Sequence, residues 1–357
     1  MAPVIFECQR RLTDVHPIIC LTGQHREMLD QVVNYFGIKH DIALDLMTPN
    51  QILASVTAKA VEKLDEVYVS EKPDCIVAQG DTTTVMAAAM VSFYRHIPFF
   101  HVEAGLRTGD LQAPWPEEFN RRVVSLVAGH HFAPTPHAAN ALLKEGVPAS
   151  IITVTGNTVI DALLFTIGRE RLRRDYWANK YSFLEARPLV LITGHRRENI
   201  GEGLENICRA ILILARDFCD HSFVYPVHPN PNVHAQVFRI LDGQRNIHLV
   251  APAAYPEFIW LLDRCTLVLT DSGGVQEEAP TLRKPVLVMR EKTERPEGIE
   301  AGTARLVGTS TDLIVKEVRR LLTDSSAYKA CQREINPYGD GRAAQRIVDR
   351  IVRYRYA

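Results

Sequence analysis

The chain has 357 residues, of which 46% are hydrophobic and 23% charged, and its formal net charge is −1. This length allows two hydrophobic cores, and the near-neutral charge argues against nucleic acid or an anionic membrane as the main partner. The seven cysteines stand singly without a CxxC pair, which argues against a disulfide framework or a structural zinc site and favours a cytoplasmic setting. No apolar run approaches the ~20 residues of a membrane span, and the opening MAPVIFECQRRL is not expected to be a signal peptide.

Short apolar runs alternate with amphipathic segments along the chain. The runs predict strands at 17–21, 75–79, 97–102, 151–155, 189–193, 223–227, 247–250, 267–270 and 286–289. The segments predict helices that include 51–68, 82–93, 203–218, 311–322 and 343–354. Such alternation is typical of βαβ units, so we predict an α/β fold of two doubly wound, Rossmann-like domains that face a central cleft. Their expected bounds are 1–166 and 167–342, with a C-terminal helix at 343–357 that can pack back on the N-terminal domain.

Two strand-exit loops in the first half carry carboxylates. In QGDTTT at 79–84, Asp81 with the threonines either caps the following helix, which is the favoured interpretation for this motif alone, or Asp81 acts as an acid or base. The loop HVEAGLRTGDLQAPWPEE at 101–118 supplies Glu103, Glu117 and Glu118. Glu118 is expected to lie at a helix start, whereas the rigid Trp115-Pro116 pair is expected to exclude water from Glu117. Crowded carboxylates push one another's proton affinities apart, which separates an acid from a base.

Two strand-exit loops in the second half carry histidines. In TGHRREN at 193–199, His195 can donate to a phosphate and transfer protons, while Arg196 and Arg197 are about as readily explained as a solvated basic loop. In YPVHPNP at 225–231, His228 either lines the cleft or fills the bend, and the structural interpretation is favoured.

The loop TDSGGVQEEAP at 270–280 is the most specific of these patterns. Its paired glycines allow a ligand to approach the backbone, and its serine and helix start suit a phosphate. Glu278 would repel a pyrophosphate, so we expect it to accept hydrogen bonds from ribose hydroxyls. Arg295 offers a second anion or sugar contact, with an exposed charge run as the alternative. Carboxylates in one half and phosphate-binding loops in the other predict a nucleotide-linked sugar substrate.

Eight motifs together resemble the non-hydrolysing UDP-N-acetylglucosamine 2-epimerases, in the same order and along the whole chain. They are GDTTT (80–84), HVEAGLRTGD (101–110), PWPEE (114–118), TGNTVID (155–161), TGHRRE (193–198), DSGGVQEEAP (271–280), TERPE (293–297) and NPYGDG (336–341). The resemblance implies a GT-B-like fold with an interdomain active site and reversible conversion of UDP-GlcNAc to UDP-ManNAc by anti elimination and re-addition of UDP. It also implies that no metal or nicotinamide cofactor is needed, and a cytoplasmic homodimer that serves surface polysaccharide synthesis.

The resemblance also implies roles for individual residues. The positions that match catalytic residues are Asp81, Glu103, Glu117 and His195. Those that match UDP or substrate contacts are Phe258, Ser272, Gly273, Gly274, Glu278 and Arg295. The loop that in some members binds a second, activating UDP-GlcNAc matches Gln24, His25, Arg26 and Glu27.

One departure from the family pattern concerns the start of the sequence. The family begins with a strand and a GTRPE loop ahead of an internal MAP sequence, and this sequence opens on MAP. We therefore expect this protein to be less stable than a longer homologue and to have an impaired turnover. The alternatives to a non-hydrolysing epimerase are a hydrolysing epimerase that releases ManNAc and UDP, a GT-B glycosyltransferase, and a UDP-sugar-binding protein without turnover.

Overall fold

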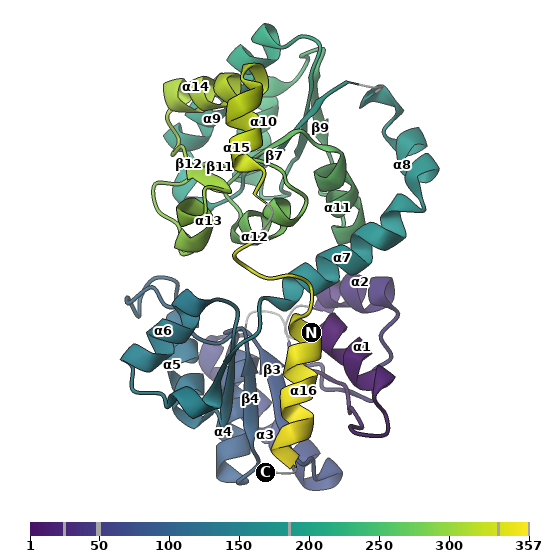
Figure 1. Cartoon of the computed structure of the whole chain (residues 1–357), viewed down its shortest axis with the longest axis vertical. Coiled ribbons are helices and arrows are strands. Elements are labelled where there is room, and N and C mark those ends of the chain that lie inside the picture. Colours follow the sequence, from purple (N-terminus) through teal and green to yellow (C-terminus); the bar gives the residue numbers. More distant parts are fainter. Residues whose placement is uncertain (24–25, 48–50, 185–186, 334–335, 356–357) are drawn as a thin grey trace. The chain divides into compact units, whose positions relative to one another are not determined.

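The computed structural model describes residues 1–23, 26–47, 51–184, 187–333 and 336–355. It divides the chain into two compact units, of which unit 1 is Met1–Ala162 with Tyr338–Ala357 and unit 2 is Leu163–Pro337 (Figure 1). These boundaries lie a few residues before the expected 166/167 and 342/343. The helix α7 (Thr158–Arg171) runs through the first of them, so the charged stretch near residue 167 is helical. No helix within the described ranges is both long and apolar enough to cross a membrane.

Unit 1 is built on a four-stranded parallel sheet whose strands follow one another in sequence order. These are β3 (Ile76–Gln79), β4 (Phe99–Val102), β5 (His130–Ala133) and β6 (Ile152–Val154). A separate two-stranded parallel sheet joins β1 (Cys20–Leu21) to β2 (Ile42–Ala43). The other elements are α1 (Ala2–Arg10), α2 (Arg26–Phe36), α3 (Leu53–Glu71), α4 (Thr83–Tyr94), α5 (Glu117–Val127), α6 (Pro136–Lys144), the 3-10 turn η1 (Ala149–Ile151) and α16 (Ala343–Arg355).

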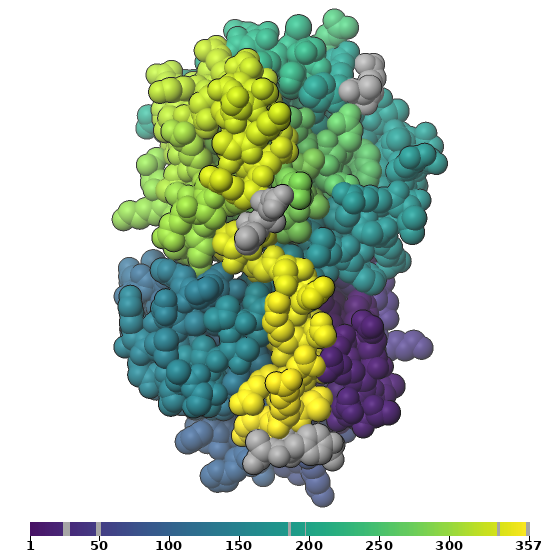
Figure 2. All heavy atoms as spheres, in the orientation of Figure 1, coloured from purple at the N-terminus to yellow at the C-terminus, as the bar shows by residue number. Residues whose placement is uncertain are grey.

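Helices cover both faces of the unit 1 sheet. Neighbouring residues of a strand point to opposite faces, so each strand contributes side chains to two cores. Phe99 packs in a core with α3, α4 and Val124 of α5, whereas Phe100 packs with Val4 of α1 and Ile347 of α16. The first and last helices of the chain therefore share one core, and α16 lies against α1 (Figures 1 and 2).

Unit 2 holds a six-stranded, all-parallel sheet in the order β12-β11-β10-β7-β8-β9. The chain starts at β7 in the centre, winds outward to β9, then returns beside β7 and winds to β12, which is the doubly wound arrangement. Its strands are β7 (Leu189–Thr193), β8 (Ser222–Pro226), β9 (Ile247–Val250), β10 (Leu267–Thr270), β11 (Val286–Val288) and β12 (Ala304–Leu306). The reversal between β7 and β10 is the place where ligands bind in such sheets.

The helices and 3-10 turns of unit 2, besides α7, are α8 (Arg174–Lys180), η2 (Ser182–Leu184), η3 (Arg197–Asn199), α9 (Glu202–Asp217), α10 (Pro231–Leu241), α11 (Tyr255–Arg264), α12 (Gly273–Thr281), α13 (Pro296–Glu300), α14 (Thr311–Thr323) and α15 (Ser325–Cys331). Two cores lie on the two faces of the sheet, one under α9, α10 and α14 and the other under α7, α8, α11 and α12.

The expected α/β class with parallel sheets is confirmed, and every strand expected from the sequence is present, the first one shortened to β1. Three strands, β2, β5 and β12, were not predicted. In β5 the pair His130-His131 interrupts the apolar pattern, yet all four residues of the strand are buried. Burial in the centre of a sheet thus overrode the polar character of the side chains.

Candidate functional site

The turn after β3 places Asp81 at the carboxyl end of the unit 1 sheet. Gly80 makes this turn with a φ of 84°, a region that favours glycine. His101 of β4 lies beside it and donates from Nε2 to the Gly80 carbonyl over 2.8 Å, and burial lowers the pKa of His101 to about 4. The helix cap is Thr82, whose hydroxyl accepts from the Val85 amide, so the expected cap is supplied by the first of the threonines and not by Asp81 itself.

Three carboxylates share one electrostatic environment in unit 1. Burial raises the pKa of Asp81; Arg121 opposes this shift, and the charges of Glu103 and Glu117 add to it. Glu103 follows β4 in a left-handed conformation with a φ of 64°, which is uncommon for a residue with a side chain. Its two carboxylate oxygens accept from the Gln79 and Asn157 side-chain amides, each over 3.3 Å. The structure therefore brings the three predicted acids together.

Arg121 links this group to a buried carboxylate. It donates to Asp81 over 2.8 Å and, from two nitrogens, to Glu118 over 3.2 and 3.0 Å. Glu118 is fully buried and also accepts from the backbone amides of Thr108 and Gly109. Glu118 thus ties the loop after β4 to helix α5, as its expected structural role implies, and holds the guanidinium that faces Asp81.

Glu117 is the first residue of α5 and is half-buried. Its neighbour Trp115 is 63% exposed. The expectation that Trp115 keeps water away from Glu117 is therefore not met within unit 1.

In unit 2, His195 and Asp271 lie just after the two strands on either side of the reversal of the sheet. His195 follows β7, and Asp271 follows β10. The backbone amides of His195 and Arg196 donate to Asp271 Oδ2 over 2.9 and 2.8 Å. The His195 Nδ1 lies 3.6 Å from Asp271 Oδ1, and its ring stacks on His228 with centroids 5.1 Å apart. Burial lowers the pKa of His195, and Asp271 opposes that shift. His228, for which a purely structural role was favoured, thus lines the same site.

The predicted phosphate loop forms the N-terminus of α12. Ser272 precedes the helix, and its hydroxyl makes no capping bond, while Gly273 and Gly274 are the first helical residues. A Cβ on Gly273 would lie 2.5 Å from the Arg295 guanidinium, which would have to shift to make room for it. Arg295 also donates to Glu277 over 2.6 Å. Helix dipole, backbone amides and guanidinium together favour an anion at this end of α12.

Further along α12, Glu278 is a buried acid. Tyr255 of α11 donates its hydroxyl to Glu278 over 3.1 Å, and burial raises the pKa of Glu278 to about 8. Phe258 stands three residues after Tyr255 and is half-buried, so both lie on the same side of α11. A carboxyl on α12 and an aromatic side chain packed against the same core suit a ribose and a base.

The structure divides the predicted site residues between its units. Asp81, Glu103 and Glu117 lie in unit 1, whereas His195 and the residues expected to bind UDP lie in unit 2. Gln24 and His25 lie outside the described residues, and so do the side chains of Arg26 and Glu27. The described residues contain no cluster of three His, Cys, Asp or Glu side chains suited to a metal ion.

Arg121, Asp271 and Asn199 are site residues that the sequence analysis did not select. A signal existed for two of them. Arg121 is four residues after Glu117 on a predicted helix, and Asp271 directly follows a predicted strand. The contact of Asn199 with Asp271, by contrast, joins residues that lie far apart in the sequence.

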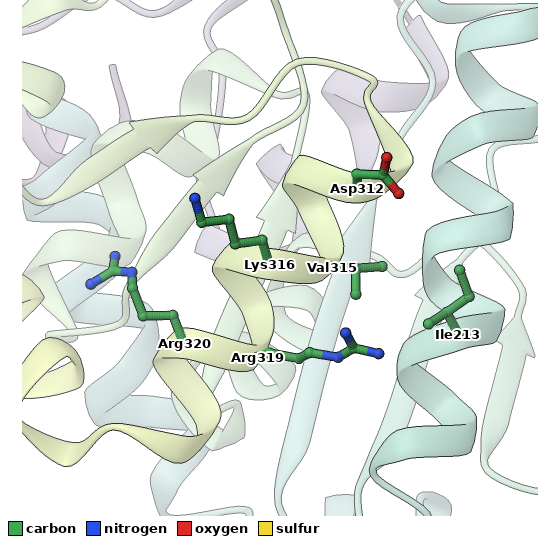
Figure 3. Close-up of a pocket in the computed structure, with 6 residues that line it drawn as sticks. All are labelled: Ile213, Asp312, Val315, Lys316, Arg319 and Arg320. Carbon is green, nitrogen blue, oxygen red and sulfur yellow. The ribbon is translucent and has the colours of Figure 1, made fainter.

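A pocket of about 620 Å³ lies elsewhere in unit 2, on the surface between α9 and α14 (Figure 3). Arg319 points toward the helix that carries Ile213, where it pairs with Asp217, while Lys316 and Arg320 point the other way. None of the predicted site residues lines this pocket. We therefore do not assign the chemistry to it.

Comparison with known proteins identifies the family. The UDP-N-acetylglucosamine 2-epimerase from Escherichia coli K12 is 50% identical over 338 residues, which cover 93% of this chain and 90% of that protein. The crystal structure of UDP-GlcNAc 2-epimerase from Neisseria meningitidis bound to UDP-GlcNAc has a TM-score of 0.92 and 45% identity, covering 99% of this chain and 96% of that one. The enzyme of Methanocaldococcus jannaschii in complex with UDP-GlcNAc and UDP has a TM-score of 0.80 at 32% identity, with 99 and 95% covered.

These comparisons establish the expected GT-B-like fold. They give no support to the expectation that a strand and a GTRPE loop are missing from this sequence. A profile described as UDP-N-acetylglucosamine 2-epimerase matches residues 7–352. The chain therefore belongs to the UDP-N-acetylglucosamine 2-epimerase family.

Proposed function

We propose that the protein interconverts UDP-GlcNAc and UDP-ManNAc by reversible epimerisation at C2. The observation that carries this proposal is the 50% identity, over 93% of the chain, to the E. coli UDP-N-acetylglucosamine 2-epimerase. The grouping of three carboxylates in unit 1, and in unit 2 of side chains suited to a phosphate and a ribose, supports it.

In the proposed reaction a carboxylate removes the proton from C2. The C2–H electron pair forms the C1=C2 double bond of 2-acetamidoglucal, and the C1–O bond breaks with its electrons on the departing UDP. UDP then returns to C1 while a proton reaches C2 on the opposite face. We assign proton transfer to Asp81, Glu103 and Glu117 as a set, because a protonated and an ionised member are both needed and crowding favours this division.

The second unit is proposed to hold the nucleotide. The N-terminus of α12 with Ser272, Gly273, Gly274 and Arg295 takes the phosphates, and Glu278 accepts from the ribose hydroxyls. Phe258 packs on the uracil, and His195 acts on the departing phosphate as a proton or hydrogen-bond donor.

Deuterium incorporation tests the proposal. Incubation of UDP-GlcNAc with the protein in D2O should place deuterium at C2. Reactions started from UDP-GlcNAc and from UDP-ManNAc should reach the same mixture of the two UDP-sugars. Retention of the original hydrogen at C2 during turnover would rule the mechanism out. Proton NMR of the products separates the alternatives, because a hydrolysing epimerase releases free ManNAc and UDP, and a glycosyltransferase requires an acceptor.

We further propose a cytoplasmic homodimer that supplies surface polysaccharide synthesis. The seven free cysteines fit a reducing compartment. Light scattering on the purified protein tests the dimer. A second, activating UDP-GlcNAc at Gln24, His25, Arg26 and Glu27 predicts a sigmoidal rate curve that becomes hyperbolic in Arg26→Ala.

A further inference from the structure

Asp271 is a buried carboxylate at the reversal of the unit 2 sheet. The residue is fully buried, and its Oδ2 accepts three hydrogen bonds. The donors are the amides of His195 and Arg196 and the side chain of Asn199, which lies at 3.2 Å. These contacts offset the cost of burying the charge and fix the backbone on which the His195 ring stands.

The other oxygen of this carboxylate faces His195. Oδ1 is buried and accepts no hydrogen bond from any group in the described part of the chain. His195 Nδ1 lies 3.6 Å from Oδ1, a few tenths of an ångström beyond hydrogen-bond distance. A buried acceptor is costly when it stays unpaired, and hydrogen bonds of catalytic groups are often long without a ligand. The small closure needed here therefore has a favourable driving force.

We infer that Asp271 is a positioning residue for His195, accepting Nδ1–H through Oδ1 and so leaving Nε2 as the nitrogen that meets the ligand. This inference rests on the proposed function for the identity of the ligand, a nucleoside diphosphate that departs and returns. With Nδ1–H held by a carboxylate, the imidazole can carry a positive charge while Nε2–H donates to the phosphate oxygen that becomes negative.

The charged groups around His195 act in opposite directions. Asp271 favours the imidazolium, whereas the stacked ring of His228 and the guanidinium of Arg196 oppose it, as burial does. Among these neighbours Asp271 is the one that stabilises the charged ring. Its removal should therefore lower the pKa of His195 further, and the variant should need a lower pH to reach its remaining activity.

Asp271→Asn is the decisive variant. Its amide oxygen can still accept from the two backbone amides, while its NH2 group takes the place opposite Nδ1, so His195 should change to the Nε2–H tautomer. In 15N-histidine-labelled protein the two His195 nitrogen signals should exchange their protonated and unprotonated shifts, with the signals assigned by comparison with His195→Gln. We expect kcat to fall by about 10²-fold or more, the usual contribution of a general acid, because the variant no longer stabilises the imidazolium that gives a proton to the departing phosphate; KM should change much less.

Asp161→Asn is the matched control. Asp161 likewise accepts two backbone amides, those of Ala343 and Ala344 at 3.2 and 2.9 Å, but it lies in unit 1. Asp161→Asn should change the melting temperature by a small amount similar to that of Asp271→Asn. It should leave the nitrogen signals of His195 unchanged. If the role of Asp271 were purely structural, both variants would leave the nitrogen signals of His195 unchanged.

The wild-type spectrum keeps the inference testable even if Asp271→Asn does not fold. A neutral Nε2–H tautomer of His195 in the wild-type protein would overturn it, as would Asp271→Asn with unchanged His195 signals. If the wild type shows the Nδ1–H tautomer but produces no UDP-ManNAc from UDP-GlcNAc, the proposed function fails and the positioning of His195 by Asp271 stands.

Discussion

At the scale of single residues, the carboxyl groups of this protein have different fates according to their surroundings. Glu117 and Glu118 are neighbours at the start of α5, yet Glu118 is fully buried in ion pairs and Glu117 is half-buried. Glu278 is buried as well, and its carboxyl accepts a hydrogen bond from the Tyr255 hydroxyl. Residue type alone therefore does not assign a role, whereas burial and partners do.

Glu117→Gln should lower kcat by about 10²-fold or more, because the isosteric amide keeps the shape but cannot exchange a proton. The affinity for UDP, measured by calorimetry, should change little, since Glu117 and the proposed UDP contacts lie in different units. The reverse pattern, intact kcat with weakened UDP binding, would show that chemistry and recognition are assigned to the wrong halves.

Glu278→Gln should make the unliganded protein more stable at pH 8. The folded-state pKa of about 8 lies above the ordinary value of 4.5, so the folded state binds more protons than the unfolded state between these pH values. Its stability therefore falls as pH rises through this range, with a slope of up to about 1.4 kcal/mol per pH unit. Between pH 5 and pH 8, the melting temperature of the wild type should fall by more than that of the variant.

Above pH 8, where the Glu278 carboxyl is ionised, the same Glu278→Gln variant should bind UDP about tenfold more weakly than the wild type, because a hydrogen bond to a charged acceptor becomes one to a neutral acceptor. Glu257→Gln is the control on α11, where Glu257 accepts from the Tyr181 hydroxyl over 2.7 Å. No gain in stability at pH 8 is expected for it. An equal gain in both variants would refute the role of Glu278 burial.

At the scale of elements, the ends of strands decide where the side chains of the site lie. The turn after β7 passes against Tyr225 of β8, whose hydroxyl donates to the Gly194 carbonyl over 2.7 Å. Tyr225 is fully buried and cannot easily move. The loop that carries His195 is therefore fixed by a neighbouring strand.

Gly194→Ala should destabilise the protein by about 1–3 kcal/mol, the usual range for overpacking, because its Cβ would lie 2.9 Å from the Tyr225 hydroxyl oxygen. Tyr225→Phe removes that oxygen, so urea unfolding of the double variant should cost less than the sum of the two single changes. Gly168→Ala is the control, since Gly168 is in α7 with open space around it, and it should be neutral or stabilising. Strict additivity would contradict the clash.

At the scale of the whole molecule, each unit has its own cores, and unit 1 is completed by the last helix of the chain. Ile347 of α16 is fully buried against strands β4 and β5, although more than two hundred residues separate it from them. Its contribution to stability therefore belongs to unit 1.

Ile347→Ala should cost about 2–5 kcal/mol, as expected for a large-to-small change in a core. Hydrogen exchange should then speed up in Met1–Ala162 and Tyr338–Ala357, while Leu163–Pro337 keeps its protection. Ile211→Ala, in the core beneath α9, should give the opposite distribution. Faster exchange throughout the chain for both variants would mean that the units unfold together.

The sequence by itself determined the α/β class, the positions of β7, β9 and β10, and the three carboxylates Asp81, Glu103 and Glu117 that the structure groups together. Apolar runs and glycine-containing exits are local signals, so they are legible without a structure. The tertiary structure decided the rest, because the deciding contacts join residues far apart in the chain. Arg121 reaches Asp81 across forty positions and Asp271 reaches His195 across seventy-six. Burial, which a sequence does not display, made β5 a strand and set the protonation of Glu278.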